Sequence, residues 1–585
     1  MKERIENLRR RSRLFAGLVL LFFGIILLRC FHLQILKGSY YTALARRNAT
    51  LKITIKAPRG RIYDRNGRLL VENRATFSLS IIRALSKSPS RTLAEISNIV
   101  KIPLPVLLER LYKHRDYPRR KPIVVAENLS MREVSLIEAF KEKFPEIMVE
   151  VEPQRYYLYP EATAHIIGYV GEASKRDIKN MNVEMGDMVG KMGLEREYDR
   201  FLRGEDGYRL LLRDSLGNPV KLKEEVLPKE GSVLVTSIDL ALQLFVYRRL
   251  KDLKGSAIVV SPETGEILAM VSSPSFNSNL MSSRFDDEYK LKIMRDPSKP
   301  LYTRAIQGTY PIGSIFKLAV AVAALKKRII GPGDKIFCPG YFRFGGRDFR
   351  CWTAGGHGWV NLYKAIEQSC NVYFYKMGAR LGINNIVDVV SHFPFGRRTG
   401  IDIPNEKTGI LPSPAWKKKA LGIQWFPGET ISLAIGQGYL IATPLQVALF
   451  GTAIANRGWY PQPHFVIKIA GQQTGGWKTV RTGIEPGIFE EIIKGMKRVV
   501  ERGTGRSARI PGLEICGKTG TAQIVALERT KEIRPHSLFL AFAPCGKPEI
   551  VVFVIVERSG AGSEFAVPIA RDILRFYFNE KNKGN

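Results

Sequence analysis

The chain has 585 residues, enough for a large core and more than one domain. Its hydrophobic and charged fractions, 45% and 25%, are ordinary for a globular protein, but its formal net charge of +35 is not. The basic residues are scattered and no nucleic-acid-binding motif is present, which argues against DNA or RNA. The positive charge fits attraction to an anionic membrane or cell-wall polymer, and the alternative is a simply solvated basic surface.

The first predicted element is a membrane anchor at residues 14–36. Leu14 to Leu28 are continuously apolar or small, and apolar residues continue to Leu36, which gives about the 20 residues that a bilayer-spanning helix needs. Residues 1–13 carry six basic and two acidic side chains, so they predict a cytoplasmic tail, a single pass through the inner (cytoplasmic) membrane, and a chain that continues outside it. A cleaved signal peptide is the main alternative, but no small-x-small cleavage site follows the apolar run.

Residues 37–230 carry no recognisable catalytic constellation. Asn66-Gly67 between two extended runs predicts a hairpin turn, and residues 92–150 show a helical, charged pattern. His165 is a lone histidine in a mixed stretch, and such a residue is more often structural than catalytic. We therefore predict a mixed pedestal or partner-binding domain.

Residues 231–585 predict a separate α+β domain. Apolar runs at 256–260 and 267–271 flank a Pro-Glu-Thr-Gly turn and indicate a hairpin. Further strands and a last helix are expected at 233–239, 513–525, 537–544, 549–557 and from about Val567. Together they predict a central antiparallel sheet flanked by helices.

Ser314-Ile315-Phe316-Lys317 opens an apolar run of helical composition. On a helix, residues i and i+3 share a face, so the Ser314 hydroxyl and the Lys317 amine could come within hydrogen-bond reach. A serine becomes a good nucleophile only when a base takes its proton, and lysine is such a base only when burial or another cation lowers its pKa. Taken alone, the pattern also fits an N-capping serine followed by a solvated lysine, so the downstream residues have to decide.

Two later motifs supply partners for that pair. Ser369-Cys370-Asn371 offers a hydroxyl and an amide that can relay a proton and hold a peptide carbonyl. Lys518-Thr519-Gly520-Thr521 lies in what is predicted to be an edge strand, where the cation and the threonine hydroxyl can bind a carboxylate and the glycine lets an acyl chain lie against the backbone. A second K-T-G, at residues 407–409, has prolines on both sides, which predicts a surface loop without a catalytic role.

Cys338, Cys351, His357 and Cys370 form a second group of candidate residues, with the spacing C-x12-C-x5-H-x12-C. Tetrahedral zinc favours thiolate and imidazole ligands, so the group is a candidate zinc site. The alternative, in an oxidising compartment, is a disulfide such as Cys338–Cys351 with His357 as a bystander. Because Cys370 lies inside the Ser-x-Asn motif, a bound ion would hold that loop beside the nucleophile.

The order S-x-x-K, S-x-N, K-T-G is the signature set of penicillin-recognising serine acyltransferases. With the stretches at 59–67 and 165–172, these motifs resemble the class B penicillin-binding proteins, and the stretches at 351–358 and 399–404 resemble more narrowly the penicillin-binding protein 2 subfamily. The resemblance covers essentially the whole chain and implies an elongation-specific peptidoglycan D,D-transpeptidase.

The same resemblance implies roles for individual residues. Ser314 would attack the penultimate D-Ala carbonyl of a stem peptide, release the terminal D-Ala, and pass the acyl group to an amine of a neighbouring stem. Lys317 would be the base and Ser369 a proton relay, with Asn371 beside it. The backbone N–H groups of Ser314 and Thr521 would form the oxyanion hole.

The resemblance also implies partners. These are peptidoglycan stem peptides and their lipid-linked precursor, β-lactam antibiotics, the membrane, and a polytopic glycosyltransferase of the rod-shape system. Residues 37–230 would be a pedestal or dimerisation domain, because they carry no glycosyltransferase motif of the E-D-x-x-F-x-x-H type. Some relatives bind zinc in the region of the Cys/His group with Asp, His and Cys ligands, and the set in this chain is richer in cysteine.

Other functions share part of the pattern. A β-lactam-hydrolysing enzyme or a β-lactam sensor has the same three motifs, but class A lactamases add an E-x-x-L-N pentad that is not found after Ser369, and sensors have several membrane spans. A D,D-carboxypeptidase differs only in using water instead of an amine as acceptor, so this alternative stays open. A non-catalytic scaffold of the elongation machinery is disfavoured because every motif residue is present.

Overall fold

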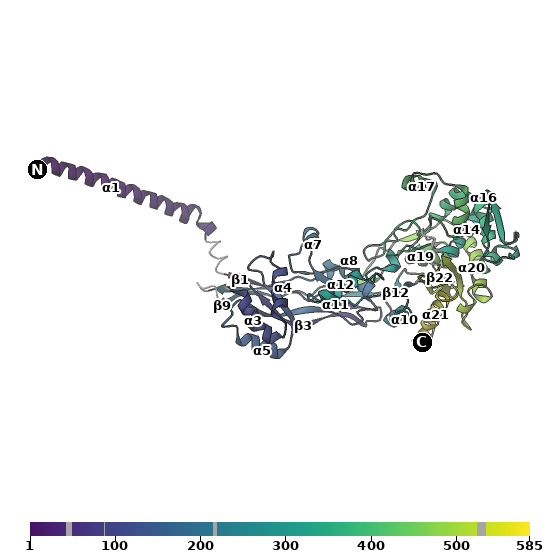
Figure 1. The fold of residues 1–585 in the computed structure, drawn as a ribbon, viewed down its shortest axis with the longest axis horizontal. Coiled ribbons are helices and arrows are strands. Elements are labelled where there is room, and N and C mark those ends of the chain that lie inside the picture. Colours follow the sequence, from purple (N-terminus) through teal and green to yellow (C-terminus); the bar gives the residue numbers. More distant parts are fainter. Residues whose placement is uncertain (42–49, 87, 214–218, 523–533, 585) are drawn as a thin grey trace. The chain divides into compact units, whose positions relative to one another are not determined.

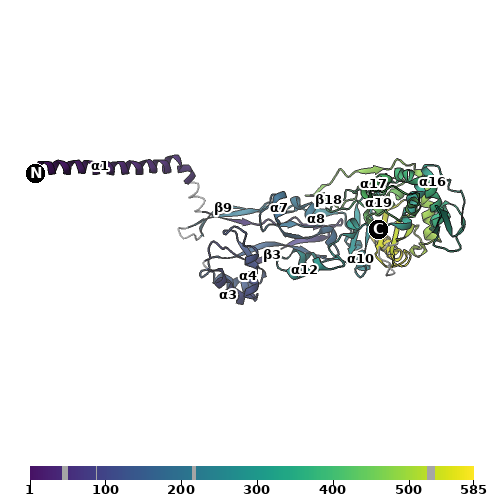
Figure 2. The ribbon, with the colours of Figure 1, turned by 45° about the horizontal axis from the view of Figure 1, so that its top comes forward.

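The computed structural model describes residues 1–41, 50–86, 88–213, 219–522 and 534–584. The chain divides into two compact units, each built from three segments (Figures 1 and 2). The first unit comprises Met1–Pro58, Ala75–Pro153 and Gly204–Glu230, and the second comprises Arg59–Arg74, Gln154–Arg203 and Gly231–Asn585. Two segments that precede residue 231 therefore belong to the same unit as the predicted catalytic domain.

The first unit begins with a long apolar helix. Helix α1 (Lys2–Phe31) continues into a short π-helical turn, η1 (His32–Leu36), and none of their side chains is buried in the protein. Among the described helices, this 35-residue element is the one that is long and apolar enough to cross a membrane. It agrees with the predicted single-pass anchor.

The rest of the first unit has its own apolar core. Helices α3 (Pro89–Val100), α4 (Leu104–Lys113) and α5 (Met131–Ala139) pack with the paired strands β3 (Leu69–Ile81), β4 (Ile123–Leu129) and β5 (Ile147–Tyr157). The region predicted as helical therefore also contains strand β4 and the start of β5. Strands β1 (Thr50–Ile55), β8 (Gly207–Arg213) and β9 (Pro219–Val226) form a separate antiparallel sheet.

A buried ion-pair network holds the early segments of the second unit together. The Arg59 guanidinium lies 2.8 Å from Glu195 and 3.0 Å from Asp199, and Arg155 lies 2.6 Å from the other oxygen of Glu195. Nearby, β2 (Ile62–Tyr63) pairs with the start of β3 across the predicted turn at Asn66-Gly67. The remaining elements of these segments are α6 (Ala164–Ile167), β6 (Val170–Glu172), α7 (Lys175–Asn180), β7 (Met188–Gly190), α8 (Gly193–Glu197) and α9 (Asp199–Leu202).

A five-stranded antiparallel sheet forms the centre of the second unit. Its strand order is β12-β11-β23-β22-β21. The bounds are β11 (Gly255–Val260), β12 (Ile267–Ser273), β21 (Cys516–Ala522), β22 (His536–Ala543) and β23 (Ile550–Val556). The strand expected at 233–239 is β10 (Leu234–Thr236), which pairs with β2 and β18 (Val466–Ile469) and not with this sheet.

Helices cover both faces of this sheet, as Figure 1 shows around β22. Ala257 and Val259 of β11 point into one apolar core with α10 (Leu240–Leu250) and α21 (Ala566–Gly584). Ile258 and Val260 point into the other, with α14 (Phe316–Lys326) and α19 (Pro444–Ala455). Because both faces are covered, β22 and β23 are buried at every position, which explains their continuous apolar sequence. The predicted α+β architecture is confirmed.

The other elements of this unit surround the sheet or form small two-stranded ribbons. The helices are α11 (Ser278–Ser282), α12 (Asp287–Arg295), α13 (Arg304–Gln307), α15 (Leu362–Glu367), α16 (Asn371–Val390), α17 (Pro414–Leu421), α18 (Pro427–Leu433) and α20 (Pro486–Glu501). The ribbons pair β13 (Ile336–Cys338) with β16 (Gly358–Val360), β14 (Tyr341–Phe344) with β15 (Arg347–Arg350), and β17 (Trp459–Pro461) with β20 (Thr479–Arg481). Strand β19 (Gln472–Gln473) pairs with β18.

Candidate active site

Ser314 lies in a tight turn immediately before α14. Residues Gly313–Ile315 form one turn of 3-10 helix, and the Ser314 side chain is partly exposed at its surface. Gly313 has φ +51°, and a Cβ atom there would lie 2.6 Å from the carbonyl oxygen of Thr521. Glycine is therefore required at this position, and its lack of a side chain lets the Ser314 turn approach the K-T-G strand closely.

Lys317 lies in the first turn of α14 and is completely buried. Its Nζ atom donates to the Ser369 carbonyl at 2.8 Å, to the Ser369 hydroxyl at 3.2 Å and to Asn371 Oδ1 at 2.7 Å. Burial lowers the pKa of Lys317 to about 8, so a substantial fraction is neutral near physiological pH. These hydrogen bonds of the amine all go to the Ser-x-Asn motif, and the predicted contact between Lys317 Nζ and the Ser314 hydroxyl is not among them.

Ser369 is placed between two lysine amines. Its hydroxyl lies 3.2 Å from Lys317 Nζ and 3.1 Å from Lys518 Nζ. It has φ +52°, an unfavourable conformation for a residue with a side chain, and it fills the short turn between α15 and α16. Burial and the nearby Lys317 both lower the pKa of Lys518 well below its usual range, because two ammonium groups are repelled in so small a space.

The K-T-G residues lie on β21, which is an edge strand of the central sheet, as predicted. Lys518 and Thr519 are buried, whereas Thr521 is exposed beside the Ser314 turn. A Cβ on Gly520 would lie 3.1 Å from the Ile312 carbonyl oxygen, so the glycine again permits a close approach of backbones. The structure therefore brings all three motifs together, although 149 residues separate Ser369 from Lys518.

Thr504 also belongs to this site and was not predicted. Its hydroxyl lies 2.7 Å from the Thr519 hydroxyl, so it holds the side chain that is expected to bind a carboxylate. Thr504 lies in the turn after α20, and no sequence motif marks it. By contrast, the second K-T-G at residues 407–409 lies outside helices and strands with Lys407 exposed, as predicted.

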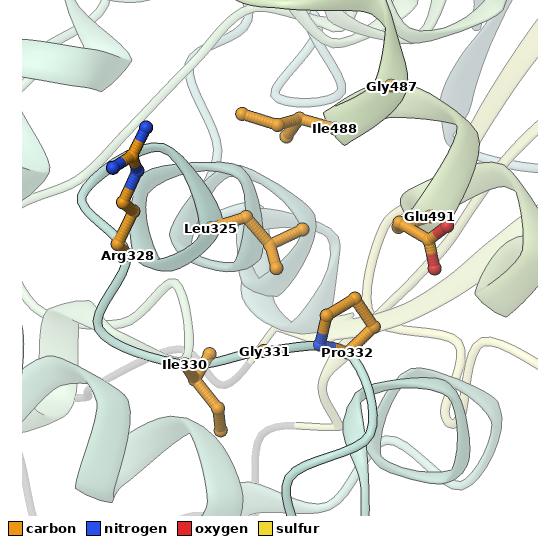
Figure 3. A pocket seen from close by; sticks show the side chains of 8 residues that line it. All are labelled: Leu325, Arg328, Ile330, Gly331, Pro332, Gly487, Ile488 and Glu491. Atoms are coloured by element: carbon orange, nitrogen blue, oxygen red, sulfur yellow. The ribbon is translucent and has the colours of Figure 1, made fainter.

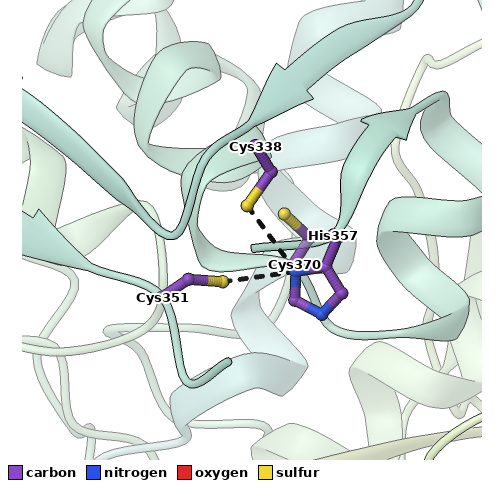
Figure 4. A group of neighbouring side chains, drawn as sticks. All are labelled: Cys338, Cys351, His357 and Cys370. Carbon is purple, nitrogen blue, oxygen red and sulfur yellow. Dashed lines mark hydrogen bonds between the residues drawn. The ribbon is translucent and has the colours of Figure 1, made fainter. Parts of the chain in front are cut away.

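The Cys/His group is also assembled in the structure (Figure 4). The ligand atoms of Cys338, Cys351, His357 and Cys370 all lie within 4.8 Å of one another. His357 Nδ1 lies 3.6 Å from Cys338 Sγ and 3.4 Å from Cys351 Sγ. A hydrogen bond between Cys370 and Cys351 lowers the pKa of the Cys351 thiol and raises that of Cys370.

The three cysteines of this group are free thiols, so the Cys338–Cys351 disulfide is not formed in the structure. A different pair, Cys516 and Cys545, is disulfide-bonded and links the start of β21 to the end of β22. This bond was not predicted, because Cys545 lies in a turn beyond the strand and only the antiparallel pairing of β21 with β22 brings it close.

Family models match both parts of the chain. A penicillin-binding protein transpeptidase domain model matches residues 255–575, and a penicillin-binding protein dimerisation domain model matches residues 54–236. The chain is 34% identical to the peptidoglycan D,D-transpeptidase MrdA of Haemophilus influenzae over 99% of this chain and 93% of that protein. The chain belongs to the penicillin-binding protein 2 family of peptidoglycan D,D-transpeptidases. It is a serine-type, penicillin-binding member of that family.

Solved structures of the penicillin-binding protein 2 family have the same fold. In a complex between PBP2 and MreC from Helicobacter pylori, the matching chain is 30% identical with a TM-score of 0.80, over 90% of this chain and all of that one. A peptidoglycan synthase complex that coordinates polymerization and crosslinking contains a chain that is 29% identical with a TM-score of 0.71, over 96% of this chain and 97% of that one.

One open pocket of this penicillin-binding protein lies away from the motifs. It has a volume of about 330 Å³, and Figure 3 shows Arg328 and Glu491 on opposite sides of it. It lies at the C-terminal end of α14, beside Leu325. Lys317 lies at the other end of that helix, about 12 Å from Leu325 at 1.5 Å per residue, and Ser314 lies in the turn before it.

Proposed function

We propose that this protein cross-links peptidoglycan stem peptides through an acyl-enzyme on Ser314. The observation that carries this assignment is the placement of the Ser369 hydroxyl within hydrogen-bond distance of both Lys317 and Lys518, next to the Ser314 turn. Among the described residues, neither amine forms a hydrogen bond with a carboxylate, so each can exchange a proton with a serine hydroxyl.

In the acylation step, Ser314 Oγ attacks the penultimate D-Ala carbonyl carbon while neutral Lys317 takes the hydroxyl proton. The backbone N–H groups of Ser314 and Thr521 stabilise the negative charge that develops on the carbonyl oxygen. The C–N bond then breaks, and the terminal D-Ala leaves as an amine after it receives a proton relayed through Ser369. An acceptor amine attacks the ester carbonyl carbon, the bond from that carbon to Ser314 Oγ breaks, and a proton from the amine returns to Ser314 Oγ.

Substrate binding uses the outer edge of β21, since the described part of this strand pairs only with β22. A stem peptide that lies along this edge can add main-chain hydrogen bonds to the sheet as an extra strand. Its terminal carboxylate reaches Lys518 and the Thr519 hydroxyl, which Thr504 holds in place. A β-lactam that mimics the D-Ala-D-Ala end acylates Ser314 in the same position.

A cross-linking assay tests this function. The full-length protein is incubated with lipid-linked precursor and a polytopic glycosyltransferase, and the digested products are separated by mass. We expect cross-linked dimers with the native chain and none with Ser314→Ala. Release of D-Ala without dimers would instead identify water as the acceptor and support the carboxypeptidase alternative.

We also propose that Cys338, Cys351, His357 and Cys370 hold a structural zinc ion. Zinc bound tetrahedrally at about 2.3 Å from sulfur and about 2.0–2.1 Å from nitrogen places the two ligand atoms about 3.6 Å apart. The His357 Nδ1 distances of 3.6 and 3.4 Å to two sulfurs match this value. Three free thiols beside a disulfide elsewhere in the chain fit a metal that protects them from oxidation.

Elemental analysis of the unreduced protein tests the zinc site. We expect about one zinc per chain, and loss of that zinc in Cys338→Ser. A zinc content near zero, together with a mapped disulfide among Cys338, Cys351 and Cys370, would exclude the site.

Finally, we propose that residues 1–13 are cytoplasmic and that the catalytic unit acts outside the inner membrane. The basic tail before the apolar helix supports this orientation. The family and the relatives described above support a glycosyltransferase of the rod-shape system as partner. Protease added to spheroplasts should digest residues beyond 36 and spare the tail, and the opposite pattern would overturn the orientation.

A further inference from the structure

Trp352 follows a proposed zinc ligand and is held by two contacts although it is not a core residue. The residue is 62% exposed, so packing alone does not account for its place. Its indole N–H donates to the Gln368 carbonyl at 3.1 Å, and its ring packs edge-on against His357 with centroids 5.3 Å apart. The residue therefore touches both the Cys/His group and the segment that carries Ser369.

The bonded carbonyl has a direct influence on Ser369. The Gln368 carbonyl and the Ser369 N–H lie in one rigid peptide plane, and the orientation of this plane sets φ of Ser369. The N–H of Ser369 bonds to the Ile366 carbonyl at 3.3 Å, a long contact, whereas Trp352 holds the carbonyl on the other side of the plane. Since Ser369 has the unfavourable φ of +52°, its conformation depends on such external contacts.

We propose that Trp352 is a positioning residue for acylation. Its indole N–H fixes the orientation of the Gln368–Ser369 peptide plane, so that the Ser369 hydroxyl stays between Lys317 and Lys518. Its ring, which contacts His357, couples this peptide plane to the Cys/His group. The Cys/His group thus acts on the catalytic serine motif through two routes, by Cys370 within the motif and by Trp352 from outside it. This inference rests on the roles proposed above for Ser314, Lys317 and Ser369.

Trp352→Phe removes the N–H donor and keeps an aromatic ring. Trp359 offers a matched control because it is 63% exposed in the same region and its ring instead contacts Phe337. The measurement is penicillin acylation of the full-length protein, resolved into the dissociation constant of the first complex and the rate constant of acylation. We expect Trp352→Phe to lower the acylation rate constant about tenfold. Its dissociation constant, zinc content and melting temperature should stay unchanged. Trp359→Phe should match the native chain in all four quantities.

Trp352→Ala removes the ring as well. We expect this variant to lose zinc to a chelator faster than Trp352→Phe does, since the contact with His357 is gone. Equal rates of zinc loss for the two variants would refute the role of the ring.

Several results would refute the positioning role of the Trp352 indole N–H. One is an acylation rate constant of Trp352→Phe equal to that of the native chain. Another is an equal fall of the rate constant in Trp352→Phe and Trp359→Phe. The third is a fall in Trp352→Phe that comes with a lower zinc content or melting temperature. Ser314→Ala tests the proposed function separately from this inference. Penicillin labelling that survives in Ser314→Ala would refute the assignment of Ser314 as nucleophile, independently of the Trp352 variants.

Discussion

At the scale of single residues, the site depends on two lysine side chains that are buried against one serine hydroxyl. Burial disfavours the charged form of both Lys317 and Lys518, and the charge of Lys317 disfavours it further at Lys518. Both shifts favour the neutral amine more than water does. This is the property that a proton acceptor for Ser314 requires.

The pH dependence of acylation follows from Lys317. Its pKa is lowered to about 8, and only the neutral amine accepts a proton. The acylation rate constant should therefore rise between pH 6 and pH 8 and level off above it, when measured with a penicillin at fixed ionic strength. A rate that falls over this range would contradict the assignment of Lys317 as the base.

The two K-T-G motifs give a matched pair of lysine variants. Lys518 is buried at the site and Lys407 is exposed in a loop, so Lys518→Ala should lower the acylation rate about 100-fold or more and Lys407→Ala should leave it within about twofold. Gel labelling with a fluorescent penicillin over time measures both. The reverse outcome would show that the wrong motif was chosen.

The meeting of the three motifs was predictable, because the proposed chemistry restricts them to a few residue types in a fixed order. Prolines on both sides of Lys407 were enough to set the second K-T-G aside. The contacts of Thr504 and Trp352 were not predictable, because they join segments that meet only in the folded chain. Trp352 lies in a stretch that resembles the family, but that resemblance gave it no role.

At the scale of elements, the site is the meeting of the Ser314 turn with the edge strand β21. Gly313 and Gly520 allow this approach, since a side chain at either would meet backbone atoms of the other element. The disulfide between Cys516 and Cys545 fixes β21 to β22 at the end of the strand. The geometry of the proposed oxyanion hole would thus be set by backbone packing between two elements.

Gly313→Ala should disturb the close backbone contact between the Ser314 turn and β21. The left-handed conformation costs a residue with a side chain about 1–3 kcal/mol, and the new methyl group would push the turn away from Thr521. We expect acylation to fall about 100-fold, because small displacements of a nucleophile have large kinetic effects. Gly333→Ala is the control, since nothing lies within 4 Å of a Cβ there, and equal activity of the two variants would contradict this account.

The hairpin of β11 and β12, the edge strand β21 and the final helix were predicted because apolar runs with clear turn signals identify them. The strands inside residues 92–150 were missed. Strand β4 is a short apolar run between charged helices, and a run of that length does not distinguish a strand from a buried turn of helix.

At the scale of the whole molecule, the order of anchor, mixed domain and catalytic domain was predictable from apolar length, charge asymmetry and motif positions. The assignment of Arg59–Arg74 and Gln154–Arg203 to the catalytic unit was not. It depends on buried ion pairs such as Arg59 with Glu195, whose partners lie 136 residues apart in the chain. Sequence periodicity carries no information about such pairs.

The central claim is that Ser314 is the nucleophile of this membrane-anchored transpeptidase, and peptide mapping tests it most directly. The full-length protein in membranes is labelled with a penicillin, digested, and analysed by mass spectrometry. We predict one acyl adduct, on the peptide that contains Ser314, and no adduct in Ser314→Ala. An adduct on another serine, or labelling that survives in Ser314→Ala, would contradict the account.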